Sequence, residues 1–199
     1  MAEVEGFILA GGASSRMGTD KAALKIDNET LVARVGRALS AITDRVSVVS
    51  SRAGHGAFGL PVVRDLREGA GALGGLHAAL SACRAERAMV VSCDLPFVSS
   101  ALFARLVSLA SPEFDAVAPV QPDGRPQPLC ALYGRAACLP AATRLLDAGE
   151  LRPRVLLRGV RTRWVAPDEL ADLPGAEIFF TNVNTREEYE RAKKMMNDE

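Results

Sequence analysis

Residues 7–21 read FILAGGASSRMGTDK, and this stretch decides the expected fold of the chain. The apolar run at its start predicts a buried β-strand, and a glycine-rich turn follows that strand directly. The adjacent glycines Gly11 and Gly12 allow φ > 0 and let backbone N–H groups approach another molecule closely. Arg16 and Lys21 add the positive charge that an oligophosphate needs. The stretch therefore predicts a strand followed by a loop that holds the triphosphate of a nucleotide.

The spacing within this loop differs from two common phosphate-binding motifs. A Walker A motif needs glycine followed directly by lysine and then serine or threonine, whereas Gly18 is followed by Thr19 and Asp20. The dinucleotide motif G-x-G-x-x-G is also missing, because Gly11 and Gly12 are adjacent. A P-loop hydrolase is thus excluded, and an ordinary tight turn is the alternative on spacing alone.

The composition indicates a globular protein. The 199 residues are enough to bury a core, and 48% hydrophobic with 24% charged residues are ordinary globular values. The 24 Lys and Arg balance the 24 Asp and Glu, so no net field attracts nucleic acid or anionic lipid. No apolar run reaches the roughly 20 residues that cross a bilayer, and the acidic N-terminus is unlike a secretory signal. We therefore expect a cytoplasmic protein that binds neither nucleic acid nor membrane.

The cysteines and histidines give little support for a zinc site or for covalent catalysis. Cys83, Cys93, Cys130 and Cys138 are scattered without a C-x-x-C pair, so buried reduced thiols are expected. The chain has only two histidines, and no Ser/His/Asp spacing stands out.

Apolar runs alternate with helical patterns along the chain. In the first half we expect a helix at 31–42 with Thr30 as its N-cap, and strands at 46–49, 61–63 and 88–92. In the second half we expect a helix after Ser99 or Ser100, strands at 115–120 and 129–133, a helix at 136–147 and a strand at 178–180. A last helix should start at Thr185, which with Glu188 has the spacing of a capping box. This alternation predicts parallel β-α-β units in an open α/β sheet.

Three polar residues, Ser50, Asp65 and Asp94, come just after expected strands. Ligands of open α/β sheets bind at the carboxyl ends of the strands, so these residues and the loop at 11–21 are expected on one edge. A carboxylate there, such as that of Asp94, is unfavourable unless a cation meets it. Mg²⁺ suits the position, because it prefers one or two carboxylates with phosphate oxygens and water. Alternatively, Asp94 caps its own turn or pairs with Lys21.

Two later segments carry candidate ligand contacts. Arg152, Arg154 and Arg158 form a basic group suited to a phosphorylated acceptor, with Arg154 the preferred member, and solvated surface arginines are the alternative. Asn182 and Asn184 alternate after the last expected strand, so both amides point to one side and could hydrogen-bond a heteroaromatic ligand. Asx turns are the alternative for these asparagines.

The string LAGGxSxRMGxDK at residues 9–21 resembles the signature loop of nucleotidyltransferases that load a nucleotide onto a phosphorylated acceptor. It is most similar to the molybdenum cofactor guanylyltransferases, because the double glycine and the Asp-Lys pair match that branch better than the cytidylyl branch. Further matches are Asp-Leu-Pro at 94–96, Gln-Pro-Leu at 127–129 and Asn-Val-Asn-Thr at 182–185. They extend along nearly the whole chain in the expected order.

This resemblance implies one domain, residues 1–199, with a three-layer α/β/α nucleotide-diphospho-sugar-transferase-like (Rossmann-like) fold and a mostly parallel central sheet. The part to about residue 100 would bind the nucleotide, and the C-terminal part the acceptor. The implied reaction moves GMP from GTP to molybdopterin-bound molybdenum and releases pyrophosphate. The implied cofactor is Mg²⁺, and molybdoenzymes or their chaperones are further implied partners.

The resemblance also assigns roles to residues. The expected catalytic residues are Arg16, Lys21 and Asp94, with Asp94 as the metal ligand. The expected binding residues are Leu9, Ala10, Gly11, Gly12, Lys21, Ser50, Asp65, Asp94, Arg154, Asn182 and Asn184. Within this set, the backbone N–H groups of residues 10–12 would bind the phosphates. The glycine-rich stretch at 69–75 would lie against the base, although on composition alone it reads as a flexible connection. Ser50 and Ala72 depart from the family pattern, which has asparagine and proline there.

Two other functions fit the sequence. One is the same fold with another NTP, such as CTP, or with another phosphorylated acceptor. The other is a non-catalytic nucleotide-binding module, and the joint presence of Lys21 and Asp94 favours an enzyme over it.

Overall fold

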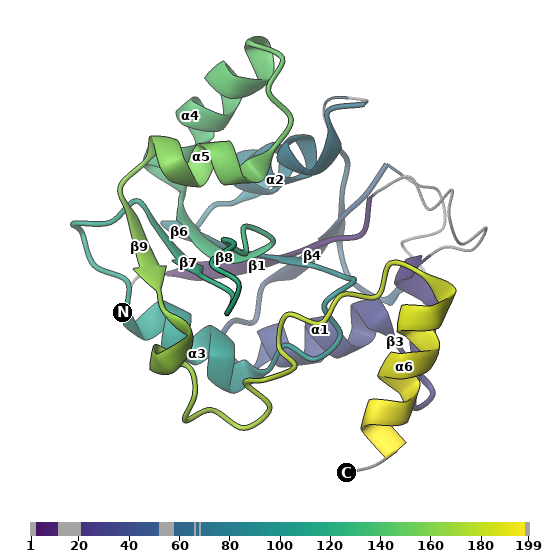
Figure 1. Cartoon of the computed structure of the whole chain (residues 1–199). Helices are drawn as coiled ribbons and strands as arrows, with labels where there is room; N and C mark the ends of the chain where they lie inside the picture. Colours follow the sequence, from purple (N-terminus) through teal and green to yellow (C-terminus); the bar gives the residue numbers. More distant parts are fainter. Residues whose placement is uncertain (1–2, 12–20, 52–57, 66, 68, 198–199) are drawn as a thin grey trace.

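The structure is a computed structural model, and it describes residues 3–11, 21–51, 58–65, 67 and 69–197 (Figure 1). The strands of its main sheet are β1 (Val4–Leu9), β4 (Val46–Val49), β5 (Val62–Val63), β6 (Arg87–Ser92), β7 (Ala116–Pro119), β8 (Cys130–Gly134) and β9 (Thr162–Val165). The short strands β2 (Lys25–Ile26) and β3 (Glu29–Thr30) form a separate hairpin. The helices are α1 (Leu31–Ser40), α2 (Gly71–Ala82), α3 (Ser100–Ser108), α4 (Arg135–Asp147), α5 (Pro153–Gly159) and α6 (Arg186–Asn197), with the 3₁₀ turns η2 (Lys21–Ala23) and η4 (Pro167–Glu169).

Helices cover both faces of the main sheet (Figure 1). α2, α4 and α5 pack on one face, and α1 and α3 pack on the other. The three-layer α/β/α architecture is therefore confirmed. No helix in the described part of the chain is long and apolar enough to span a membrane.

The strands of the sheet follow the order β5-β4-β1-β6-β8-β7-β9. Only β8 runs against its neighbours, so the mostly parallel sheet is confirmed within the described residues. Leu9 lies opposite both Val49 of β4 and Ser92 of β6. These three strands consequently end at the same level, and the residues that follow them meet at one edge.

The central strands are buried on both faces, which explains their unbroken apolar runs. Every residue of β1 is buried. Ile8 belongs to the hydrophobic cluster on the side of α1 and α3, whereas Phe7 and Leu9 belong to the cluster on the side of α2. Side chains of a strand alternate between faces, so one strand contributes to both halves of the core.

Two helix starts predicted from the sequence are confirmed. The Thr30 hydroxyl accepts a hydrogen bond from the Ala33 N–H at 3.2 Å and caps α1. Of the two serines considered for α3, Ser99 is the cap, because its hydroxyl accepts from the Leu102 N–H at 3.2 Å. All four cysteines are buried and free, as expected.

The strand predicted at residues 178–180 is wrong. This segment forms turns, in which the Ile178 N–H donates to the Gly175 carbonyl and the Thr181 N–H donates to the Ile178 carbonyl. Its apolar character serves core packing, since Phe179 is almost fully buried. A run of three apolar residues has no periodicity that separates a strand from a packed turn.

The glycine-rich stretch at 69–75 is not a loop throughout, because α2 begins at Gly71. A Cβ atom at Gly74 would lie 2.5 Å from the side chain of Ala70, and one at Gly75 would lie 3.6 Å from that of Leu9. The glycines therefore allow the first turns of α2 to pack tightly on the chain before it and on the end of β1.

The sequence did not predict α5, β9 or the short hairpin of β2 and β3. Five arginines interrupt the apolar residues between positions 152 and 165, which obscures both periodicities. β9 pairs in parallel with β7 and completes the sheet. Because β6 and β7 both run antiparallel to β8, the carboxyl ends of β7 and β9 face the same edge as that of β6.

Candidate active site

Backbone hydrogen bonds align the carboxyl ends of four parallel strands. The Ser50 N–H donates to the Val63 carbonyl at 2.9 Å, the Ala10 N–H to the Val49 carbonyl at 3.0 Å, and the Cys93 N–H to the Leu9 carbonyl at 3.1 Å. Gly11, Ser50, Asp65 and Asp94 therefore follow neighbouring strands at one edge, as the topology predicted.

Lys21 meets the C-terminal segment at this edge. It opens η2, and its Nζ donates a hydrogen bond of 2.9 Å to Oδ1 of Asn184, a residue 163 positions away in the sequence. The contact joins the residue that follows the glycine-rich loop to the Asn-Val-Asn-Thr segment.

Asp94 lies beside the same segment. Its backbone carbonyl accepts a hydrogen bond from the Val183 N–H at 2.9 Å, and its side chain is partly exposed. Burial raises the pKa of the Asp94 carboxyl, while hydrogen bonding to Ser92 and the charge of Lys21 lower that pKa in part. The Glu188 charge adds to the increase. A carboxylate that is desolvated in this way is stabilised by a further cation.

The capping box predicted at Thr185 and Glu188 is confirmed and fixes this segment. The Glu188 carboxylate accepts the N–H groups of Asn184 at 2.6 Å and Thr185 at 3.1 Å, and the Thr185 hydroxyl accepts the Glu188 N–H at 3.1 Å. The start of α6 thus sets the position from which Asn184 reaches Lys21.

The two asparagines have different contacts in the structure. Asn184 accepts from Lys21, whereas the Asn182 side-chain amide donates to the Phe180 carbonyl at 3.3 Å. The Asn182 contact is local, but it is not the Asx turn considered as the alternative, because there the side-chain oxygen accepts a backbone N–H two residues further on. The prediction that both amides turn to one ligand therefore does not describe this arrangement.

Asp65 lies where β5 leads into α2. One oxygen of its carboxylate accepts the Arg67 N–H at 3.1 Å, and the Arg67 guanidinium pairs with Asp147 of α4 at 2.7 Å. The second carboxylate oxygen of Asp65 makes no hydrogen bond to any residue that the structure describes. Ser50 is only 2% exposed, so the hydroxyl that replaces the family's asparagine is enclosed by protein.

One prediction for the phosphate loop needs correction. The Ala10 N–H was expected to bind phosphate, but it donates within the sheet to Val49 and so is already used. Leu9 and Ala10 are both buried, whereas Gly11 is exposed. Gly12 and Arg16 lie outside the described residues, so their expected roles have no structural description.

The arginines of the basic group differ in their surroundings. Arg152 is paired with Glu150, and hydrogen bonding to Arg152 lowers the pKa of that carboxyl to about 2. Arg154 is exposed on the first turn of α5. The chain just before α5 contacts α2, because the Leu73 N–H donates to the Leu151 carbonyl at 3.3 Å. Helix α5, which carries Arg154, therefore packs on the α2 face of the sheet, whereas α6 lies on the side of α1 (Figure 1).

No group of three or more His, Cys, Asp and Glu side chains that could hold a metal ion occurs in the described part of the chain. Among the described residues, Asp94 is thus not part of a complete protein cage for a metal ion. Sequence reasoning found Asp94 and Lys21 because each directly follows a recognisable motif. It did not assign the influence of Glu188 on Asp94, since Glu188 is distant in the sequence and only the fold brings its charge near Asp94.

Comparison with known proteins gives the family. Residues 6–164 match the MobA-like NTP transferase domain. The chain belongs to this family. A probable molybdenum cofactor guanylyltransferase from Pelotomaculum thermopropionicum is 35% identical over 196 residues, which cover 98% of this chain and 94% of that protein. A molybdenum cofactor guanylyltransferase from Desulfosudis oleivorans is 31% identical over 195 residues, covering 97% and 96%. The predicted family is confirmed.

Solved structures confirm the fold of this NTP transferase. Molybdopterin-guanine dinucleotide biosynthesis protein A from Archaeoglobus fulgidus superposes with a TM-score of 0.80 at 22% identity, covering 98% of this chain and all of that chain. The 2-C-methyl-D-erythritol 4-phosphate cytidylyltransferase from Thermus thermophilus gives 0.72 at 20% identity, covering 98% and 99%. At such identities the superpositions show the fold alone.

Proposed function

We propose that this NTP transferase moves GMP from GTP to molybdopterin-bound molybdenum, with release of pyrophosphate, to form the guanine dinucleotide cofactor. Its curated relatives carry that activity in their names and match over nearly their whole length. The single observation that carries the proposal is the meeting of Lys21, Asp94 and Asn184 at one sheet edge.

The reaction needs positioning and charge stabilisation rather than a covalent enzyme intermediate. An oxygen of the acceptor's terminal phosphate forms a bond to the α-phosphorus of GTP, and the bond between the α-phosphorus and its bridging oxygen breaks. The electron pair leaves with pyrophosphate. In this proposal the amides from Gly11 onward and the cations Arg16 and Lys21 stabilise the negative charge on the leaving group.

The residues at the edge fit a magnesium ion. Asp94 offers one carboxylate, and burial raises the pKa of that group. The neighbouring loop would bring phosphate oxygens, and Mg²⁺ prefers a mixture of carboxylate, phosphate and water ligands. Asp94 would hold the ion, which when bound would orient the triphosphate and offset its charge.

Lys21 in this proposal changes partner when the nucleotide binds. Its ammonium now donates to Asn184, and a triphosphate oxygen is the stronger acceptor because it is charged. Asn184 thus holds Lys21 near the position where the phosphates arrive. This lowers the entropic cost of ordering a long side chain on binding.

The other assigned residues divide between the two substrates. We assign Leu9, Gly11 and Gly12 to the phosphate loop and Ser50 and Asp65 to the guanosine. We assign Asn182 and Asn184 to the acceptor side, and we retain Arg154 as a cation for a phosphate group, now on the α2 side.

The four free buried cysteines suit a reducing compartment, and we propose a cytoplasmic location with molybdoenzymes or their chaperones as recipients of the product.

The test is incubation with Mg²⁺, molybdenum-loaded molybdopterin and each of GTP, CTP, ATP and UTP, followed by analysis of pyrophosphate and of the dinucleotide product. We expect the guanine dinucleotide with GTP as the preferred substrate. Preference for CTP would move the assignment to cytidylyl transfer, a chemistry that the cytidylyltransferase from Thermus thermophilus performs on this fold. Nucleotide binding without pyrophosphate release would indicate a non-catalytic module.

A further inference from the structure

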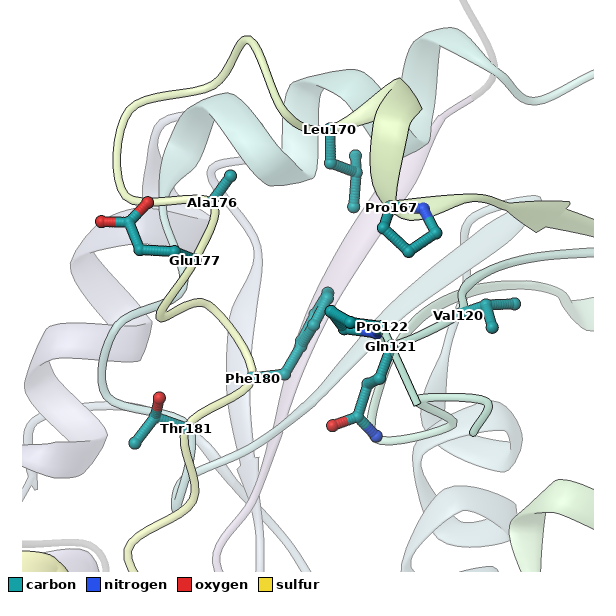
Figure 2. Close-up of a pocket in the computed structure, with 9 residues that line it drawn as sticks. All are labelled: Val120, Gln121, Pro122, Pro167, Leu170, Ala176, Glu177, Phe180 and Thr181. Atoms are coloured by element: carbon teal, nitrogen blue, oxygen red, sulfur yellow. The ribbon is translucent and has the colours of Figure 1, made fainter. Parts of the chain in front are cut away.

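A pocket of about 190 Å³ opens beyond the carboxyl ends of β7 and β9 (Figure 2). Three separate segments line it, namely residues 120–122 after β7, residues 167–170 at η4, and residues 176–181 before the asparagine segment. The pocket lies at the same sheet edge as Asp94, because β7 and β9 run in the direction of β6. None of the site predictions from the sequence included these lining residues.

The wall of the pocket is held in place by polar contacts outside it. The Glu169 carboxylate accepts the Ala166 N–H at 2.9 Å and pairs with Arg163. The Arg105 guanidinium of α3 binds the Glu169 carbonyl and the Asp172 carboxylate, the latter at 2.7 Å. The pocket is therefore formed without a ligand, as small-molecule sites generally are.

The interior of the pocket is apolar and its rim is polar. Leu170, Pro122 and the ring of Phe180 point inward, while the Gln121 amide and the Thr181 side chain lie at the margin (Figure 2). The one charged lining residue among those described, Glu177, directs its carboxylate away from these apolar groups. No lysine or arginine occurs among the described lining residues, so a phosphate group is a poor occupant. Sites that enclose a whole drug-sized ligand measure about 300–1,000 Å³, so this pocket suits a single ring system.

The pocket is connected to Asp94 through a short stretch of chain. Phe180 and Thr181 line the pocket, the Asn182 amide bonds the Phe180 carbonyl, and the Val183 N–H bonds the Asp94 carbonyl. Two residues span at most about 7 Å, so Thr181 and Val183 are separated by no more than that. A ring bound in the pocket would consequently leave its phosphate arm within reach of the Asp94 edge.

We infer that this pocket binds the pterin ring system of the acceptor, an inference that rests on the proposed function. Phe180 and Pro122 supply apolar surface for the flat heteroaromatic ring. Gln121 and Thr181 supply a donor and acceptors for the ring's polar edge. The guanine of GTP has a similar amino-oxo-pyrimidine edge, so the test must separate the two ligands.

The experiment titrates the full chain with 6-hydroxymethylpterin by the ligand's own fluorescence, and with GTP and Mg²⁺ by calorimetry. Phe180→Ala removes the ring, and Ala176→Leu fills the pocket without deleting a contact. Val62→Ala, on the exposed side of the edge strand β5, is the matched control. Thermal melting of each variant verifies folding.

We expect both pocket variants to weaken pterin binding about 10-fold, which is the size of effect that loss of ring packing produces. The Kd of GTP should be unchanged in both variants.

The outcomes separate this inference from the proposed function. Pterin binding that both pocket variants leave intact, or no pterin binding by the wild-type chain, would overturn the pocket assignment even if GMP transfer occurs. Weaker GTP binding in both variants would make the pocket a base site and would also overturn the assignment. Absence of GMP transfer, with pterin binding that the two variants abolish, would overturn the proposed function and leave the pocket assigned to a pterin.

Discussion

The two halves of the candidate active-site edge are built differently. At the ends of β4, β1 and β6, functional candidates directly follow regular strands, and the register of those strands sets their level. Beyond β7 and β9, the edge is formed by turns and by residues 176–185, which no strand supports. The first half is fixed by the sheet, whereas the second half depends on individual contacts such as Lys21 to Asn184. The comparison indicates that substitutions in the first half should affect chemistry, and those in the second should affect alignment and acceptor binding.

The largest effect is expected for Asp94→Asn. The amide keeps the shape of the carboxylate but loses the charge that a metal on the triphosphate requires. We expect GMP transfer to fall by about 10³-fold or more, in the range that single electrostatic groups contribute to catalysis. Steady-state pyrophosphate release measures this, and circular dichroism should show an unchanged fold. Full activity in this variant would exclude Asp94 as the metal ligand.

Lys21→Ala should have the next largest effect, because the leaving pyrophosphate loses a cation. We expect kcat to fall about 100-fold, with partial recovery in Lys21→Arg, which keeps the charge but changes the geometry. The matched control is Lys25→Ala, an exposed lysine on the β2 strand nearby. An equal loss of kcat in Lys25→Ala and Lys21→Ala would show that any nearby positive charge has this effect, and would contradict a specific role of Lys21.

Asn184 tests the second half of the edge. Asn184→Ala frees Lys21, and we expect up to about a 10-fold loss in kcat/KM, because ordering a free, rotamer-rich side chain on binding costs about 0.5–1.5 kcal/mol. Asn184→Asp should be worse than alanine, because the new carboxylate pairs with Lys21 and competes with the triphosphate. Kinetics of GTP at saturating acceptor measure both variants. An aspartate variant that works better than the alanine variant would contradict the role of Asn184 as a holder of Lys21.

Asp94→Asn, which should lower activity, should raise the stability of the folded chain. Burial raises the pKa of the Asp94 carboxyl, so the folded state binds the proton more tightly than the unfolded state does. The ionised carboxylate therefore destabilises the fold as pH rises through the raised pKa. Asp94→Asn should therefore have a higher Tm than the wild-type chain near pH 7 without metal. The difference should shrink as pH falls toward the ordinary aspartate range near 4. Melting curves at pH 4.5 and 7 test this, and a constant difference at both values would argue against the burial cost.

The smallest effect is expected at the cap of α6. Thr185→Ala removes a side-chain cap and should cost about 1 kcal/mol of unfolding free energy, as N-cap removal typically does. Thr30→Ala at α1 is the matched control, since it removes the same kind of cap from a different helix. Urea unfolding measures both. We expect only Thr185→Ala to lower kcat/KM as well, because it loosens the segment that holds Asn184.

The same division explains how much the sequence could predict. Ser50, Asp65 and Asp94 were placed correctly on one edge because parallel strands end together, and the Thr30 and Ser99 caps follow local rules. The Lys21–Asn184 contact spans 163 positions and has no local pattern. The pocket is assembled from three distant segments, and the apolar residues near Phe179 pack in a turn that reads like a strand.

The central claim is that Lys21 and Asp94 act on the same triphosphate, and a double-mutant cycle tests it most directly. The measurement is kcat/KM for GMP transfer by Lys21→Ala, Asp94→Asn and the double variant. We expect the double variant to be little worse than Asp94→Asn alone, because groups that act as a unit are not additive. A double variant whose loss equals the product of the two single losses would show that the residues act independently and would contradict the claim.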